Sequence, residues 1–208
     1  MSWLKVYGAC TSCMPGEKES GGMDLTENRI DGEVVYQGGF FEVTRDQVRL
    51  PGGRTSQREF IRHPGAVAVF AALPDGRLVF ERQFRYPAGR EFLEIPAGKI
   101  DPHESPLATA RRELLEETGY AAAHWWQLPT GYPCIGYSDE RIVYFVAEGL
   151  VSGERRLDEG EFLEVLTLSL DEVRRLAASG ELCDGKTLAG LYWYEQFLAG
   201  RIERIAAV

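Results

Sequence analysis

The chain has 208 residues and a formal net charge of −9 at pH 7, with 44% hydrophobic and 26% charged residues. This composition is ordinary for a globular protein with a substantial core. The acidic balance argues against non-specific binding to nucleic acids or membranes, and no apolar run in the sequence is long enough to span a bilayer. We therefore expect neither a nucleic-acid partner nor a membrane partner.

Residues 1–22 differ from the rest of the chain and include PGEKESGG, a stretch rich in proline, glycine and charge. Such a stretch predicts a disordered extension. Cys10 and Cys13 form a C-x-x-C pair there, but no second pair of ligands follows at metal-binding spacing. Because the sequence shows no secretory signal, we expect a reducing, cytoplasmic compartment.

Residues 23–58 are predicted to form a separate β segment. Short runs of β-branched and aromatic residues are broken by turn sequences at 38–39, 45–46 and 51–53. This pattern predicts a small antiparallel N-terminal sheet. Because isolated hairpins are only marginally stable in water, we expect the segment to pack on the main domain or on a second subunit.

The main domain is predicted to cover residues 59–208. An apolar run at 65–73, a turn at 74–76 and a second run at 77–86 predict a β-hairpin that contains a buried strand. Another strand is predicted at 91–97, directly before Gly98.

The next element is predicted to be a helix over 106–118. Ser105 is a favourable N-cap, Pro106 suits the first helical position, and Gly119 suits a left-handed C-terminal cap. Four residues recur at helical spacing and predict a buried stripe: Leu107, Ala110, Leu114 and Thr118.

Three glutamates fall together on the other face of this helix, namely Glu113, Glu116 and Glu117. Like charges at this spacing destabilise a helix by roughly 0.2–0.5 kcal/mol per pair. The face is either an ordinary solvated surface or a site for a cation. Because carboxylate oxygens suit a hard ion, the second reading predicts Mg²⁺ or Mn²⁺, bound together with substrate phosphates.

The remaining elements suggest a layered α/β/α domain, since helices occur both in the middle and at the end of a β-rich chain. An acidic loop holds Asp158, Glu159 and Glu161. It is either an exposed charged turn or a loop that brings a general base to bound substrate. Strands are predicted at 124–128, 142–148 and 162–170, and helices at 170–179 and 186–198.

The stretch from Gly98 to Tyr120 resembles the signature of the Nudix hydrolases, G-x5-E-x7-R-E-U-x-E-E-x-G-U, in which U is apolar. The flanking motifs QFRYP, EFLEIPAGKID, GYSDERI and DEGEFLEV are similar to the ADP-ribose pyrophosphatase branch of that family. The positions that match the signature are Gly98, Glu104, Arg112, Glu113, Leu114, Glu116, Glu117, Gly119 and Tyr120.

The resemblance implies a Nudix-type α/β/α sandwich with a mixed sheet, and hydrolysis of a nucleoside diphosphate linked to a sugar. It implies Mg²⁺ or Mn²⁺ bound by Glu113, Glu116, Glu117 and the carbonyl of Ala97, with turnover dependent on Glu117. Glu104 and Arg112 would hold the glutamates by ion pairing, supported by Gly98 and Gly119.

The resemblance also implies a catalytic carboxylate in the acidic loop, with Glu161 as the first candidate and Glu159 as its competitor. Arg85 and Tyr86 are candidates for contacts to phosphate and base, since arginine pairs with phosphate and an aromatic ring stacks on adenine. Both are equally well read as ordinary residues at a strand end. Glu94, Asp139 and Glu140 complete the predicted substrate contacts.

One position departs from the branch. Members specific for ADP-ribose resemble S-P-G-x-[ST]-[DE]-E after the signature, whereas this chain has Ile135 in place of the proline. The alternatives are therefore a pyrophosphatase for GDP-mannose or for many nucleotide sugars, and an ADP-ribose-sensing Nudix module without activity. The chain retains the signature glutamates and has no basic DNA-binding appendage, which favours an enzyme. The resemblance further implies a homodimer that pairs through the N-terminal sheet.

Overall fold

The structure is a computed structural model that describes residues 22–157 and 160–207. The chain divides into two compact units, and the described part of the smaller one comprises residues 22–33 and 45–58. The larger unit contains residues 34–44 and those from 59 onward. The predicted extension at 1–22, with its C-x-x-C pair, lies outside the described residues except for Gly22.

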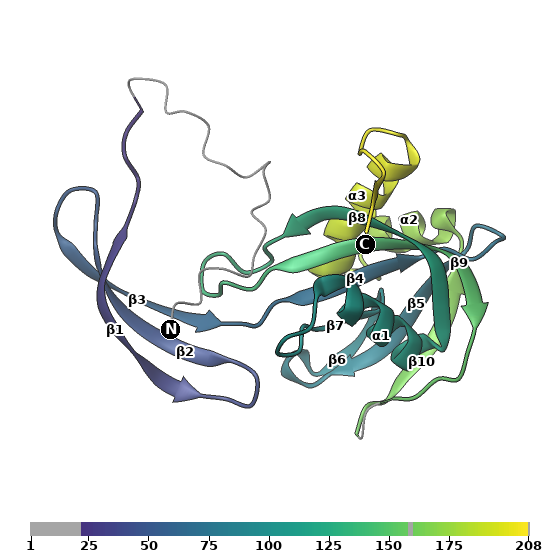
Figure 1. Ribbon diagram of the computed structural model, residues 1–208, viewed down its shortest axis with the longest axis horizontal. Coiled ribbons are helices and arrows are strands. Elements are labelled where there is room, and N and C mark those ends of the chain that lie inside the picture. The colour runs from purple at the N-terminus through teal and green to yellow at the C-terminus, as the bar shows by residue number, and fades with distance from the viewer. Residues whose placement is uncertain (1–21, 158–159, 208) are drawn as a thin grey trace. The chain divides into compact units, whose positions relative to one another are not determined.

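Three strands near the N-terminus are neighbours in one sheet, in the order β1-β2-β3 (Figure 1). Their bounds are Asn28–Gln37, Glu42–Arg49 and Thr55–Arg62. The turn predicted at 45–46 was wrong, because β2 runs through it. Asp46 is buried there and its carboxylate pairs with Arg29 at 2.9 Å, which offsets the cost of burying a charge.

The larger unit contains a five-stranded sheet in the order β11-β8-β9-β4-β7. Strand β4 is parallel to β9 and antiparallel to β7, and β8 is antiparallel to both β9 and β11. The predicted mixed sheet is thereby confirmed. The bounds are Ala66–Ala71 for β4, Ala97–Lys99 for β7, Tyr120–Gly131 for β8, Ile142–Ser152 for β9 and Ile205–Ala206 for β11.

A second sheet of the larger unit has the order β10-β5-β6 and is antiparallel. Its strands are β5 (Leu78–Arg85), β6 (Arg90–Glu94) and β10 (Leu163–Leu168). The predicted hairpin between β4 and β5 was wrong, because these strands belong to different sheets and an isolated bridge between Ala72 and Leu78 takes the place of a ladder. Strand β4 is buried on both faces and pairs with β7 and β9 instead.

Helix α1 (Pro106–Thr118) begins and ends at the predicted residues. The Ala108 N–H donates to Ser105 Oγ at 3.2 Å, and Gly119 adopts a φ of 75°. The predicted stripe is also confirmed, since all four of its members are buried. Helix α2 (Leu170–Ser179) has the predicted bounds, and α3 (Gly185–Leu198) begins one residue earlier than predicted. No helix in the described part of the chain is long and apolar enough to cross a membrane.

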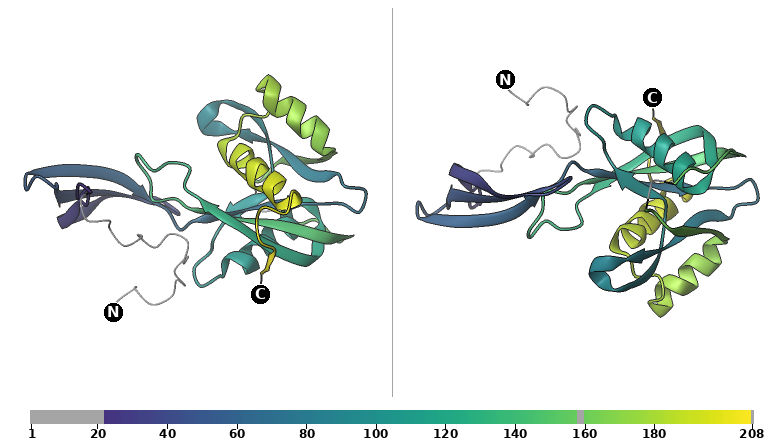
Figure 2. Two further views of the ribbon diagram at one scale, coloured as in Figure 1. Left: turned by 90° about the horizontal axis from the view of Figure 1, so that it is seen from above. Right: turned by 90° about the horizontal axis from the view of Figure 1, so that it is seen from below.

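The layers of the larger unit follow from β4, whose successive side chains point to opposite faces of the sheet. Phe70 packs in a core with residues of α2 and α3, whereas Val67 and Val69 pack in a second core with Leu114 of α1. Helices therefore cover both faces of the five-stranded sheet, α1 on one side and α3 on the other (Figure 2). This confirms the predicted α/β/α arrangement.

Candidate functional site

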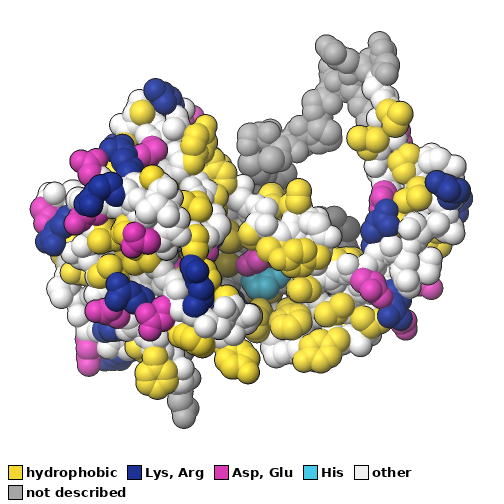
Figure 3. Space-filling view, turned by 180° about the vertical axis from the view of Figure 1, so that it is seen from behind, with side chains coloured by type: hydrophobic (Ala, Val, Ile, Leu, Met, Phe, Trp, Pro, Cys, Tyr) yellow, Lys and Arg dark blue, Asp and Glu magenta, His cyan; other side chains and the backbone are white. Residues whose placement is uncertain are grey.

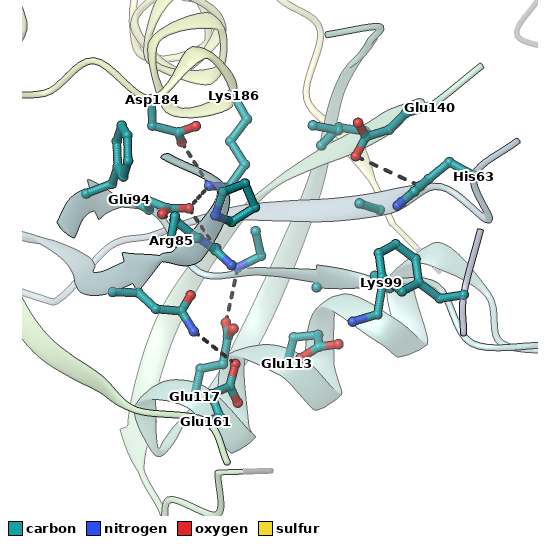
Figure 4. A pocket seen from close by; sticks show the side chains of 18 of the residues that line it. His63, Arg85, Glu94, Lys99, Glu113, Glu117, Glu140, Glu161, Asp184 and Lys186 are labelled. Carbon is teal, nitrogen blue, oxygen red and sulfur yellow. Dashed lines mark hydrogen bonds and ion pairs between the residues drawn. The ribbon is translucent and has the colours of Figure 1, made fainter. Parts of the chain in front are cut away.

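The larger unit has a cavity of about 540 Å³, bordered by β5, β6 and β7 and by residues of α1 and α3. Its lining is unusually rich in charge. Figure 4 shows three groups of side chains around it: Glu113, Glu117 and Glu161; Arg85, Glu94, Asp184 and Lys186; and His63, Lys99 and Glu140.

Glu117 lies at the end of α1 and is buried, with 4% of its surface exposed. Its Oε2 accepts a hydrogen bond from the Ala97 backbone N–H at 3.1 Å. Burial, and then the neighbouring charge of Glu81, raise the pKa of Glu117 well above that of a free glutamate. This hydrogen bond connects the end of α1 to β7 at Ala97, which lines the cavity.

Glu113 lies one turn earlier on α1 and packs directly on the backbone of Gly98. A Cβ atom at Gly98 would lie 1.9 Å from Glu113 Cδ, so only glycine permits this approach. Burial raises the pKa of Glu113 to about 6, although Arg112 opposes the shift. The predicted Gly98 and Glu113 are therefore brought together by a steric requirement.

Arg112 links three carboxylates of the signature, of which Glu113 lines the cavity. Its Nη1 lies 2.9 Å from Glu113 Oε1 and 3.0 Å from Glu116 Oε2, and its Nη2 lies 3.0 Å from Glu104 Oε2. Glu104 also accepts a hydrogen bond from the Thr109 hydroxyl at 2.8 Å. Glu116 is consequently held by Arg112 and does not line the cavity.

The donor atoms fit a hard divalent cation, because carboxylates and a backbone carbonyl are the ligands that Mg²⁺ prefers. Ala97, Glu113 and Glu117 line the cavity together. Within the described residues, no three Asp, Glu, His or Cys side chains already converge on one point that could hold a metal ion. The chemistry of the site fits such an ion, and the side chains as they stand do not form a closed coordination shell.

Glu81 on β5 was missed by the sequence analysis. It is 2% exposed, and its carboxyl group contacts that of Glu117. Burial raises the pKa of Glu81 to about 7. The available signal was the alternation of β5, which places Glu81 on the same strand face as Gln83 and Arg85.

Glu161 comes from the acidic loop before β10 and lines the cavity. Gln83 Nε2 donates a long hydrogen bond to Glu161 Oε1 at 3.5 Å. The competing candidate, Glu159, lies outside the described residues.

Arg85 and Glu94 form a bidentate ion pair on the other side of the cavity. Arg85 Nε and Nη2 each lie 2.8 Å from a Glu94 oxygen. Lys186 also bonds Glu94, and its Nζ lies 2.9 Å from Asp184 Oδ2. Burial favours the neutral form of Glu94, but Arg85 and Lys186 outweigh it and hold the pKa of this carboxyl below its usual value.

Asp184 and Lys186 were also missed. Asp184 caps α3 by accepting from the Thr187 N–H at 3.0 Å, so a D-G-K-T sequence at a helix start was the available signal. The cap brings Lys186 to the cavity. Thr187 in turn accepts from the Ile95 N–H at 3.1 Å, which fixes α3 against the residue that follows β6.

The third group surrounds His63. Glu140 Oε1 lies 3.9 Å from His63 Nδ1, which also accepts from the Gly65 N–H at 3.1 Å. The ring of Phe40 stands edge-on to His63, and Lys99 Nζ lies 4.9 Å from the centre of that ring. Three of the predicted substrate contacts thus line the cavity, namely Arg85, Glu94 and Glu140.

Other predicted residues lie away from the lining. Tyr86 belongs to the short helix η2 (Tyr86–Ala88) and is 88% exposed. Asp139 accepts the His63 backbone N–H at 2.8 Å and does not line the cavity. Ile135 is 84% exposed and is likewise absent from the lining.

Comparison with known proteins agrees with the family resemblance of the sequence. The family model described as NUDIX domain matches residues 62–191. An ADP-ribose pyrophosphatase of Bacillus subtilis (strain 168) is 39% identical over 82% of this chain and 94% of its own length. A methanol dehydrogenase activator of Bacillus methanolicus is 39% identical over 81% and 92%, respectively. A crystal structure of ADP compounds hydrolase shares the fold, with a TM-score of 0.76 and 22% identity over 87% of this chain and 100% of that one.

Proposed function

The chain belongs to the NUDIX domain family and is a Nudix hydrolase, and on that premise we propose that it hydrolyses the pyrophosphate bond of ADP-ribose or a related nucleoside diphosphate sugar. The products are a nucleoside monophosphate, AMP for ADP-ribose, and a sugar phosphate. The observation that carries the proposal is the meeting of Glu113, Glu117 and Glu161 in one cavity with Arg85.

The reaction is proposed to need Mg²⁺, or Mn²⁺ in its place. Glu113, Glu116, Glu117 and the carbonyl of Ala97 would hold the ion, and the oxygen chemistry of these groups supports it. When bound, such an ion neutralises phosphate oxygens and lowers the pKa of water. Burial raises the pKa of Glu113 and of Glu117, and neighbouring carboxylates add to both shifts.

Glu161 is proposed to take the proton from the attacking water. It reaches the cavity from a loop, and Gln83 holds one of its oxygens. A general base needs to lie within hydrogen-bond reach of the water in the substrate complex, and a loop residue can adjust to meet this need. Glu159 remains its competitor, and a pair of single substitutions separates them.

The rest of the cavity is proposed to bind substrate. The guanidinium of Arg85 bonds Glu94 through Nε and Nη2 and keeps further N–H donors for phosphate oxygens. Glu94 and Glu140 can accept hydrogen bonds from sugar hydroxyls. Tyr86 and Asp139 are proposed to approach the substrate from outside the cavity lining. The runner-up substrate is GDP-mannose, favoured by Ile135 at the position of the marker proline.

We also propose a cytoplasmic homodimer. Strand β1 exposes several apolar side chains, among them Val34 at 49% and Tyr36 at 57%, which a second copy would cover. Light scattering at micromolar concentration tests the dimer, and a monomer would contradict it.

The testing experiment is a substrate panel with Mg²⁺, in which products are identified by chromatography. The panel contains ADP-ribose, GDP-mannose, UDP-glucose, NADH and diadenosine polyphosphates. We expect preferred hydrolysis of ADP-ribose with release of AMP. Preference for GDP-mannose would keep the reaction and change the substrate, and no hydrolysis of any compound would overturn the proposal.

A further inference from the structure

One face of β5 passes from the apolar core into the cavity within a few residues. Val79 packs in the core beneath α1, whereas Gln83 and Arg85, on the same strand face, line the cavity. Glu81 lies between them and is 2% exposed. A carboxyl side chain thus occupies the position at which this strand face leaves the core.

The surroundings of Glu81 compensate its charge only in part, through the carboxyl group of Glu117 and the charge of Lys186. Its Oε1 is buried and has no hydrogen-bond partner among the residues that the structure describes, and its carboxyl group contacts that of Glu117, which is itself 4% exposed. A buried polar atom without a partner is costly, and two adjoining buried carboxylates cost more. A bound divalent cation offsets such a cost, because it supplies the opposite charge.

The basic side chains near Glu81 are engaged elsewhere. Lys186 acts on Glu81 through its charge, yet it bonds Glu94 and Asp184. Arg85 likewise forms its bidentate ion pair with Glu94. On the face that Figure 3 shows, acidic and basic side chains are interspersed. Acidic side chains outnumber lysines and arginines in the cavity lining, and Glu81, which is not part of that lining, adds a further carboxyl group against Glu117.

We propose that Glu81 is an additional carboxylate of the metal centre and binds the divalent cation jointly with Glu117. The inference rests on the proposed function, in that it assumes a metal at the glutamates of α1. It adds a ligand from β5 to a site otherwise built from α1 and the residue before Gly98. The unpartnered Oε1 supplies the oxygen donor that a hard cation requires.

The test measures the affinity of the metal-free chain for Mn²⁺ in the absence of substrate. Calorimetry and electron paramagnetic resonance report the binding. The wild type is compared with Glu81→Gln, which keeps shape and removes charge. Glu91→Gln is the matched control, because Glu91 lies on the adjacent strand β6 and is exposed. We expect Glu81→Gln to weaken Mn²⁺ binding by about tenfold or more, and Glu91→Gln to leave it unchanged. Wild-type affinity in Glu81→Gln would overturn the proposal.

Thermal melting separates a metal ligand from a residue that merely supports the fold. In EDTA, Glu81→Gln and Glu81→Leu are expected to melt at or above the wild-type temperature, because each removes a buried charge. With Mn²⁺ added, both are expected to gain less than the wild type. Lower melting of both variants in EDTA would identify Glu81 as structural and overturn the proposal.

The two levels of the account fail separately. A wild type that binds Mn²⁺ but hydrolyses no nucleoside diphosphate sugar would contradict the proposed function while the Glu81 comparison still decides the inference. A wild type that binds no Mn²⁺ would overturn the inference directly.

Discussion

Glu117 Oε2 lies 3.1 Å from the backbone nitrogen of Ala97 and accepts its hydrogen bond. The bond joins the last turn of α1 to β7, and both Ala97 and Glu117 line the same cavity. Helix and strand therefore position the proposed metal ligands as one unit. The predictions below test separate parts of this arrangement.

Replacing Arg112 with alanine tests the ion-pair hub. The guanidinium contacts Glu104, Glu113 and Glu116, so its loss leaves three carboxylates to repel one another. We expect a loss of about 2 kcal/mol in the free energy of unfolding together with weaker Mn²⁺ binding. Arg111→Ala on the same helix is exposed and serves as control. Equal denaturant midpoints for the two variants would contradict the role of the hub.

Replacing Gly98 with alanine tests the close approach of Glu113. The added Cβ would fall 1.9 Å from Glu113 Cδ, so the carboxylate must move away. A misplacement of this size is expected to lower turnover by about a hundredfold while the chain stays folded. Gly52→Ala meets nothing within 4 Å and is the matched control. Turnover by Gly98→Ala at the wild-type rate would show that the position of Glu113 is not critical.

The pH dependence of stability tests the Glu94 ion pairs. The pKa of Glu94 is lowered in the folded protein, so its contribution is present above the ordinary glutamate value and lost as pH falls through the folded value. Glu94→Gln is therefore expected to be less stable than the wild type at pH 7, with the gap closing in acid. Urea melts from pH 7 to pH 3 measure it.

The same melts on Glu91→Gln control for a general effect of removing a glutamate from β6. A stability gap for Glu94→Gln that stays constant across the pH range would show that the ion pairs contribute nothing to stability.

Several features could be predicted because they depend on neighbours in sequence. Helix α1 has its cap, its first proline and its terminal glycine within a few residues of its ends, so its bounds were found. The pairing of β4 could not be found in the same way. Its partners β7 and β9 lie far along the chain, and an apolar strand gives no sign of which neighbour it prefers.

In the site, too, the residues that could be predicted are those that depend on neighbours in sequence. The glutamates of α1 were found from helical spacing and from the family signature, whereas Glu81 and Lys186 come from β5 and α3 and meet the cavity only through tertiary packing. A buried glutamate within a strand resembles an exposed one in sequence, because alternation gives its face and not its burial. Glu81 is recognised as part of the site only from its contact with Glu117 in the folded protein.

The most direct test of the account is the turnover of ADP-ribose by Glu117→Gln in saturating Mg²⁺. Circular dichroism first establishes that the variant is folded. We predict that kcat falls by several orders of magnitude, since even one lost transition-state contact costs about a hundredfold to a thousandfold. Near-normal turnover would contradict the assignment of this face of α1 as the metal site.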